Sequence, residues 1–330
     1  MLSLPVELSP AVKMIGETVL MYAIAASVVW YESRGLSFEK EIKDFTRANL
    51  WLLIPATLSS FLIWVFGENL IFARMFSFFH ERTGFLEVLP ATTAEYFLQV
   101  VNVFVANGAL VVFLHQRKKV LWIAAGITMA FFGFLDGLLF AAMITLAGVF
   151  VPGSPVSAYV KYSVPALALF LAIAAWWLFR TPGTRVEKWL HDRPSFVAFR
   201  KATIPIYAEL LFIRFCILAP QGVLLWVCFK AFHLNIPATQ VVAVSPAVLA
   251  ASGTPITPSG LGPMQAVAIT TFGKFAPSTK IMAASLSFSL LHLIYRLPLG
   301  LGAAHTFISR VLRTGGTLKE GAQIGSITNK

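Results

Sequence analysis

The sequence predicts an all-α integral membrane protein, a polytopic helical bundle of about seven to eight spans plus a re-entrant helix pair at about residues 241–272. Hydrophobic residues make up 57% of the 330-residue chain and charged residues only 12%, whereas about a quarter of the residues in a soluble domain are charged. The apolar segments are continuous rather than alternating, which argues against a transmembrane β-barrel. We therefore expect a single polytopic membrane domain over residues 1–330 that ends in a polar cytoplasmic tail at residues 309–330.

Seven apolar segments are long enough for full spans. The fourth is longer than one perpendicular crossing, so it must tilt, protrude or bend, and Gly133 and Gly137 favour a bend. A short amphipathic helix in the membrane interface is expected at Asn69–Phe79, around Arg74. The spans are predicted at Val12–Trp30, Ala48–Phe66, Leu89–Leu114, Val120–Val151, Val156–Phe179, Ile204–Phe232 and Ile281–Val311.

The net charge of +11 comes from Lys and Arg residues in short loops between apolar segments. Such residues orient a membrane protein and meet anionic lipid, so no nucleic-acid partner is expected. More of them follow the first, third and fifth spans than the other spans, which predicts an outside N-terminus and an inside C-terminus in the cell (inner or plasma) membrane. The amphipathic face of Val186, Trp189 and Leu190 predicts a further helix on the cytoplasmic surface. Cys216 and Cys228 have no metal or redox spacing, and we expect no cofactor and no metal.

The helix must break within Ser252–Gln265, because three prolines and three glycines in this stretch cannot continue it. The flanking runs Val241–Ala251 and Ala266–Phe272 are each shorter than the roughly 20 residues of a spanning helix. Two half-helices that enter and leave the same side are therefore favoured over a kinked spanning pair with a Pro/Gly turn. The N–H groups and the dipole of such half-helices suit an anionic headgroup.

Ionisable residues inside apolar segments should face the protein interior, because a charge in hydrocarbon is costly. They are Glu95, Asp136, Glu209, Arg214 and Arg296. Glu95, Gln99 and Asn102 form one polar stripe, which either lines a cavity or joins helices by hydrogen bonds.

Arg296 cannot lose its proton and needs a carboxylate, a group of carbonyls or a lipid phosphate. Asp136 is its predicted partner, either as a structural pair or at a headgroup site. Each of the two follows an interruption in its apolar run, which hints at an inverted repeat. His292, four residues before Arg296, is interpreted as a hydrogen-bonded structural residue. No hydrolase or transferase motif is found, so we predict that the chain is not an enzyme.

Three motifs carry a resemblance to a known family. Pro255–Gln265 resembles the Pro-x-Thr-Pro-Gly-Gly-Leu-Gly-x-x-Glu signature of the lysylphosphatidylglycerol synthase transmembrane (flippase-domain) superfamily. Gly126–Asp136 resembles the family's helix that ends in Glu-Arg-x-x-Asp, and Leu293–Arg296 resembles its late Tyr-Arg. The chain departs from the family at Ser259, where the family has Gly, at Gln265, where it has Glu, and at Phe132 and Gly133, where it has Glu and Arg.

The resemblance implies a divergent stand-alone member without the synthase domain. It would be a flippase-like transporter that moves an anionic phospholipid or a polyprenyl-phosphate-linked headgroup through a polar cavity. The implied partners are the membrane lipid, a second copy of the chain or a biosynthetic enzyme. The candidate substrate-binding residues are Asp136, Arg296, Thr257, Pro258, Ser259, Gly260, Gly262, Gln265, Arg214, Glu95 and Asn102. Two alternatives remain, a scaffold or accessory subunit for lipid or cell-envelope biosynthesis and a small-solute secondary transporter.

Overall fold

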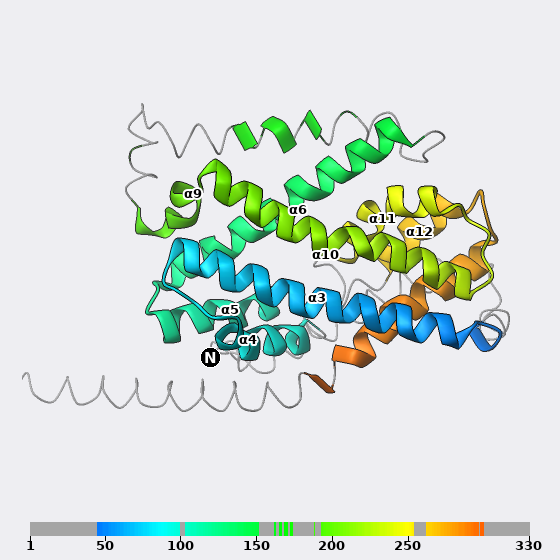
Figure 1. The fold of residues 1–330 in the computed structure, drawn as a ribbon, viewed down its shortest axis with the longest axis horizontal. Helices are drawn as coiled ribbons and strands as arrows, with labels where there is room; N and C mark the ends of the chain where they lie inside the picture. The colour runs from blue at the N-terminus through cyan, green and yellow to red at the C-terminus, as the bar shows by residue number, and fades with distance from the viewer. Residues whose placement is uncertain are drawn as a thin grey trace, which may run out of the picture.

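The structure, a computed structural model, describes residues 45–99, 103–151, 162, 165–166, 168–170, 172–173, 188, 193–253, 262–296 and 298–299. Every regular element in these ranges is a helix, and Figure 1 shows their arrangement. The elements are α3 (Leu50–Phe79), α4 (Phe85–Leu98), α5 (Val103–Lys118), α6 (Trp122–Phe150), η1 (Pro194–Phe196), α9 (Val197–Lys201), α10 (Ile204–Ala231), α11 (Ala238–Ser252) and α12 (Pro263–Phe272), followed by a helix over residues 278–296. The predicted all-helical bundle is confirmed.

Three of these helices, α3, α6 and α10, are long and apolar enough to cross a membrane. They contain 30, 29 and 28 residues, so each is about 40 to 45 Å long, which exceeds the roughly 30 Å of the hydrocarbon core. Large apolar side chains on their outer faces are exposed, among them Trp51 and Phe66 on α3 and Phe212 on α10. Such faces are what a helix presents to lipid, and they confirm a helical membrane bundle.

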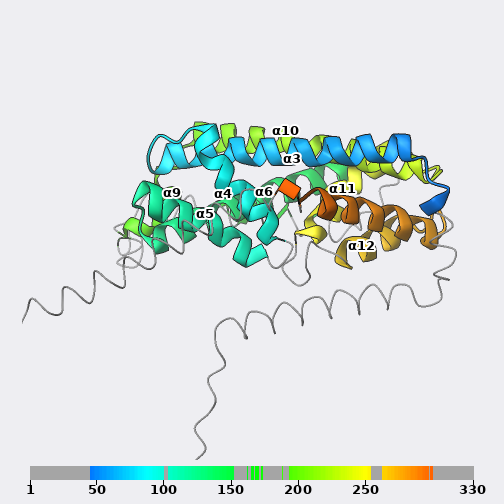
Figure 2. The ribbon, with the colours of Figure 1, turned by 90° about the horizontal axis from the view of Figure 1, so that it is seen from below.

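Helices α3 and α10 lie antiparallel, side by side (Figures 1 and 2). At one end the N–H of Asn49 donates to the carbonyl of Ala231 at 2.8 Å, and near the other end Arg74 Nε donates to Glu209 at 2.7 Å. Between these points Gly67 faces the Ile217 side chain so closely that a Cβ at residue 67 would overlap it. The missing side chain therefore sets how closely the two helices approach.

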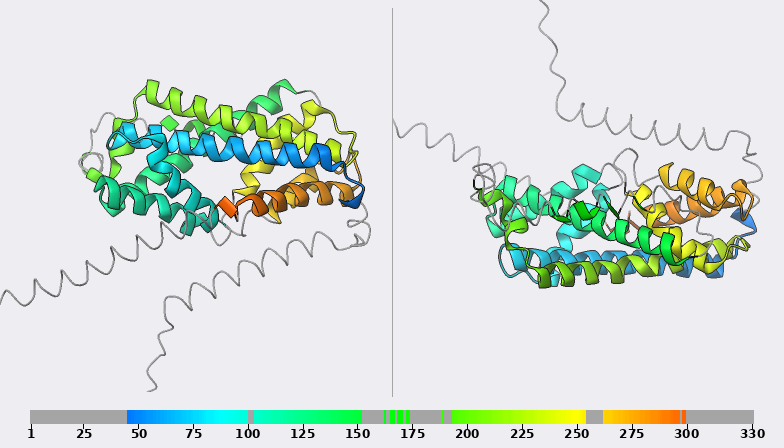
Figure 3. Two further views of the ribbon diagram at one scale, coloured as in Figure 1. Left: turned by 60° about the horizontal axis from the view of Figure 1, so that its bottom comes forward. Right: turned by 90° about the horizontal axis from the view of Figure 1, so that it is seen from above.

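The remaining helices form a second layer against the α3 and α10 pair. Helices α4, α5 and α9 lie toward one end of this layer, and α11, α12 and the 278–296 helix lie toward the other (Figure 2). Figure 3 shows α6 running obliquely across the bundle between these two groups. This arrangement leaves the middle of the bundle to be lined by helices of both layers.

One prediction about α3 is wrong. Asn69–Phe79 is not a separate interfacial helix, because α3 is continuous from Leu50 to Phe79. The polar residues that suggested an end are satisfied inside the bundle. Asn69 Nδ2 donates to the Phe85 carbonyl at 2.7 Å, and the Thr92 hydroxyl donates to Asn69 Oδ1. With these partners the helix has no reason to leave the membrane at residue 69.

The prediction of one span at Leu89–Leu114 is also wrong. The structure has two helices there, α4 with 14 residues and α5 with 16, and each is shorter than a spanning helix. They pack against each other as a hairpin. Helix α4 begins after Gly84, whose N–H donates to the Glu87 carboxylate at 3.3 Å. No proline or glycine lies at the break near Gln99, so the sequence pattern does not predict it.

Other elements are close to their predicted positions. Helix α6 is hydrogen-bonded continuously through Gly133 and Gly137, α10 is one long helix, and the break between α11 and α12 follows Ser252. The orientation in the membrane and the number of spans stay predictions. The predicted spans Val12–Trp30 and Val156–Phe179, the surface helix around residues 186–190 and the tail at 309–330 lie wholly or largely outside the described residues.

Candidate functional site

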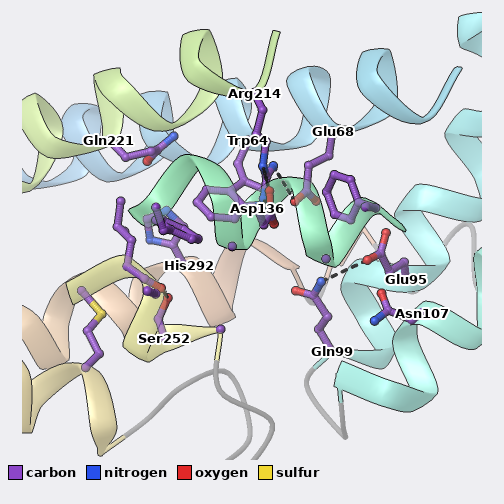
Figure 4. Close-up of a pocket in the computed structure, with 18 of the residues that line it drawn as sticks. Trp64, Glu68, Glu95, Gln99, Asn107, Asp136, Arg214, Gln221, Ser252 and His292 are labelled. Carbon is purple, nitrogen blue, oxygen red and sulfur yellow. Dashed lines mark hydrogen bonds and ion pairs between the residues drawn. The ribbon is translucent and has the colours of Figure 1, made fainter. Parts of the chain in front are cut away.

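A cavity of about 410 Å³ lies in the middle of the bundle. All the described helices of the two layers except η1 and α9 contribute to its wall, and Figure 4 shows its polar side chains converging from different elements. Its charged lining consists of three carboxylates and two guanidinium groups, namely Glu68, Glu95, Asp136, Arg214 and Arg296. Charged groups this deep in an apolar bundle are costly unless they are paired or bind a ligand.

Arg214 on α10 is fully engaged by two carboxylates. Its Nε and Nη2 donate to the two oxygens of Asp136 at 2.6 and 2.8 Å, and its Nη1 donates to Glu68 at 3.0 Å. The rings of Trp64 and Phe132 lie 5.2 and 4.9 Å from its Cζ. A two-point, coplanar pairing is the strongest geometry for arginine and a carboxylate, so Arg214 ties α3, α6 and α10 together.

The predicted pair between Asp136 and Arg296 is therefore wrong. Asp136 gives both of its oxygens to Arg214, and among the described residues no ion pair joins it to Arg296. The sequence indicates that Asp136 and two arginines lie inside the membrane, but it does not show which arginine lies next to Asp136. The packing of α6 against α10 decides this, because it brings Asp136 next to Arg214.

Arg296, on the 278–296 helix, is the second arginine of the cavity and has a different environment. Its Nε is buried without a hydrogen-bond partner in the described part of the chain. Its Cζ lies 5.8 Å from the centre of the Tyr96 ring, and the Tyr96 hydroxyl donates to Glu68. Arg296 thus contributes a positive charge to the cavity that no described carboxylate neutralises by direct contact.

The polar stripe predicted for the third span reaches the cavity through two of its three members. Glu95 and Gln99 line the wall, and Gln99 Nε2 donates to Glu95 Oε1 at 3.3 Å (Figure 4). The other oxygen of Glu95, Oε2, is buried without a hydrogen-bond partner among the described residues. Asn102 lies outside those residues.

A second polar network fastens the 278–296 helix to α3 and α10. Ser60 Oγ donates to Gln221 Oε1 and lies 3.0 Å from His292 Nε2, while His292 Nδ1 contacts the Phe288 carbonyl at 2.8 Å. One ring nitrogen of His292 meets a main-chain carbonyl and the other meets a hydroxyl, as expected for a structural histidine. The prediction for His292 agrees with this geometry.

Gln265 of the Pro/Gly motif serves the backbone of its own hairpin. Gly262, which has a φ of 98°, precedes α12, and its N–H donates to Gln265 Oε1 at 2.7 Å. The Gln265 amide group in turn donates to the Ser285 carbonyl at 3.3 Å and to Ser289 Oγ at 3.1 Å. A carboxylate could accept the first bond but could not donate the other two. An amide thus suits this position in this chain, whereas the family signature has glutamate there.

The candidate residues fall into three groups. Four of them line the cavity, two lie beside its wall at the start of α12, and five lie outside the described residues. The first group is Glu95, Asp136, Arg214 and Arg296, the second is Gly262 and Gln265, and the third is Asn102, Thr257, Pro258, Ser259 and Gly260. Ser252 and Gly253, at the end of α11, also line the cavity.

The sequence interpretation missed Glu68, which holds Arg214 from α3. A signal for it existed, since Thr57, Ser60, Trp64 and Glu68 recur at intervals of three and four and so share one helix face. The predicted end of the span at Phe66 concealed this pattern. In the described residues no group of three His, Cys, Asp or Glu side chains has a geometry that could hold a metal ion.

Residues 18–300 match the model of a protein family described as Lysylphosphatidylglycerol synthase TM region. The matched range includes every helix described above and all three motifs of the sequence. No curated protein matches the chain. The family's transmembrane region is a membrane-embedded, flippase-like domain.

Proposed function

We propose that this chain, which belongs to the lysylphosphatidylglycerol synthase TM region family, moves a phosphate-bearing lipid headgroup across the bilayer of the cell membrane through the central cavity. The headgroup belongs to an anionic phospholipid or to a polyprenyl phosphate. The proposal contains no catalytic step. The family match supports the flippase-like character, and the cavity supports the chemistry of the cargo.

The observation that carries the proposal is the state of Arg296. Of the two arginines that line the cavity, Arg214 has three bonds to carboxylates, whereas Arg296 has a buried Nε without a partner in the described residues. A guanidinium keeps its charge and offers donors in a fork that matches phosphate oxygens. A phosphate that enters the cavity would satisfy Arg296 without breaking the Arg214 bonds.

The face of α6 that borders the cavity leaves room for the cargo. Gly133 and Gly137 line the wall, and a Cβ added at either would meet no atom within 4 Å. Gly126, on the same helix, has equally open space but does not line the cavity. These glycines allow a test that separates transport from folding.

The test is Gly137→Leu against the control Gly126→Leu, measured as the movement of fluorescent phosphatidylglycerol between leaflets of proteoliposomes. Both changes replace a helical glycine, which favours the helix by about 1 kcal/mol, so both variants should fold. Only Gly137→Leu places a side chain in the cavity, and it should reduce lipid movement strongly. Equal movement by both variants and the unaltered protein, or no movement above protein-free vesicles, would refute the proposal.

A second variant tests the arginine. Arg296→Gln should lose movement of phosphate lipids while keeping the fold. Among the described residues Arg296 makes no ion pair, so its replacement leaves no carboxylate newly unpaired. Arg74→Gln is the matched control, since Arg74 is half-exposed at the end of α3, away from the cavity. Full transport by Arg296→Gln would separate Arg296 from the cargo.

A further inference from the structure

Two buried polar atoms of opposite character face the same cavity without a partner. They are Glu95 Oε2 and Arg296 Nε, and neither has a hydrogen bond within the described ranges. Buried polar atoms in native proteins are almost always hydrogen-bonded, and leaving a charged one unsatisfied is costly. Two such atoms on one cavity suit a polar ligand that brings both a donor and an acceptor.

Glu95 presents an acceptor. The residue is only 3% exposed, and its Oε1 is already occupied by the weak bond from Gln99 at 3.3 Å. An ionised carboxylate accepts hydrogen bonds and donates none. In that ionised form its free oxygen requires a donor, and a positively charged donor gives the strongest bond.

Arg296 presents donors close to that acceptor. Its Cζ lies 5.8 Å from the ring centre of Tyr96, the residue that follows Glu95 in α4. The guanidinium therefore reaches across from the 278–296 helix to the part of α4 that carries Glu95. Among the described residues no ion pair joins the two side chains.

The ion pairs of the cavity leave Glu95 and Arg296 without a direct charged partner among the described residues. Glu68 and Asp136 both bond to Arg214, and these three groups together carry one net negative charge. What remains is one carboxylate and one guanidinium. A cargo with only negative charge would satisfy Arg296 but would bring like charge toward Glu95, which disfavours binding.

We propose that Arg296 and Glu95 are the two arms of one binding site for a zwitterionic headgroup, in which Arg296 holds the phosphate and Glu95 holds a primary ammonium group. This rests on the proposed function and refines it, since the phosphate alone no longer defines the cargo. Figure 4 shows Glu95 on the α4 and α5 side of the cavity, with Glu68 and Asp136 toward its centre. Because Arg214 occupies those two carboxylates, Glu95 is the acid left to receive the ammonium.

The test compares two lipids that differ only at nitrogen, phosphatidylethanolamine and its N-acetylated form. Both are offered to the full chain in mild detergent, and the retained lipid is quantified by native mass spectrometry. The unaltered protein should retain the free-amine lipid about tenfold or more over the acetylated one, as expected for a buried bond between charged groups. Glu95→Gln should abolish this preference, whereas Glu81→Gln, at an exposed acid outside the cavity, should preserve it.

Two further variants keep the inference testable. Glu95→Asp retains the charge and should retain part of the preference, while Arg296→Gln should lower retention of both lipids. Equal retention of the two lipids by the unaltered protein would overturn the inference, as would an intact preference in Glu95→Gln or a complete loss in Glu95→Asp.

The outcomes also separate this inference from the proposed function. Movement of phosphatidylglycerol without any amine preference would contradict the zwitterionic headgroup and leave the proposed transport function standing. An amine preference that depends on Glu95, without lipid movement in vesicles, would support the binding site and contradict the proposed transport function.

Discussion

Arg214→Gln should destabilise the protein far more than Arg74→Gln, although both arginines form ion pairs between α3 and α10. The Arg214 side chain is 2% exposed, and its partner Glu68 is 5% exposed. The Arg74 side chain is 49% exposed and its partner Glu209 36%. The two pairs join the same helices at different depths, so the comparison sets a buried ion-pair cluster against an exposed single pair.

The magnitudes follow from that difference. Removing one partner of a buried pair leaves an uncompensated charge and costs about 3 to 5 kcal/mol, and Arg214→Gln strands two carboxylates, Glu68 and Asp136. An exposed pair such as that of Arg74 contributes about 0.2 to 1 kcal/mol. Since about 1.4 kcal/mol is tenfold in an equilibrium constant, Arg214→Gln should shift the folding equilibrium roughly a hundredfold or more.

The assay is thermal or denaturant unfolding of the detergent-solubilised variants, followed by size-exclusion chromatography of the folded fraction. Adding Glu68→Gln and Asp136→Asn to Arg214→Gln should recover much of the loss, because no charge then remains unpaired in this cluster. Similar losses for Arg214→Gln and Arg74→Gln would refute the reasoning. A triple variant less stable than Arg214→Gln would also contradict it.

Three further predictions follow from single sites. Burial, and then the nearby Lys201 ammonium, lowers the pKa of His80 from 6.5 to about 4. Between these pH values the unfolded chain binds a proton that the folded chain does not, so stability should fall as the pH drops from about 6.5 toward 4. His80→Gln should flatten the dependence of the free energy of unfolding on pH in this range. Gln265→Glu should destabilise the α12 hairpin by about 1 to 3 kcal/mol, because a carboxylate would face the Ser285 carbonyl, and an unchanged unfolding midpoint would contradict this. Gly137→Leu should retain the unfolding midpoint of the unaltered protein or raise it, which thermal unfolding checks independently of transport.

The sequence predicts those helices whose ends carry strong signals. Helices α6 and α10 are long apolar runs bounded by polar loops, and the α11 and α12 break is marked by the prolines and glycines of Ser252–Gln265. The α4 and α5 hairpin was missed because its break has no such residue. A helix inside the membrane can end wherever protein or water satisfies its last carbonyls, and that depends on packing that a single sequence does not contain.

The sequence predicted most of the charged residues of the candidate site, but it did not predict which of them pair with one another. Depth within the membrane identified Glu95, Asp136, Arg214 and Arg296 as interior charges, because any ionisable residue in an apolar segment must face protein. The partner of Asp136 was wrong, since it depends on the register between helices far apart in the sequence. Glu68 was missed because an incorrect helix end placed it at the edge of a span.

The order of elements indicates an internal repeat, which the sequence only hinted at. Helix α3, the α4 and α5 hairpin and α6 are followed later in the chain by α10, the α11 and α12 hairpin and the 278–296 helix. The first members of the two sets, α3 and α10, lie antiparallel. Gln99, after the first short helix of one hairpin, and Gly253, after that of the other, both line the cavity. We interpret this arrangement as the one that inverted repeats form around a shared binding site.

The two sets contribute opposite charges to that site. The three carboxylates of the cavity come from α3, α4 and α6, and its two guanidinium groups come from α10 and the 278–296 helix. One guanidinium, that of Arg214, crosses to the opposite set and joins it by three bonds, so moving the sets apart at that point would expose unpaired buried charge. If alternating access proceeds by rocking of one set against the other, we expect the pivot to lie along the contact of α3 and α10, which holds both the Arg214–Glu68 and the Arg74–Glu209 pairs. The opening and closing would then occur where the sets are not bonded by charge, between Arg296 and Glu95, which is where the headgroup is proposed to bind.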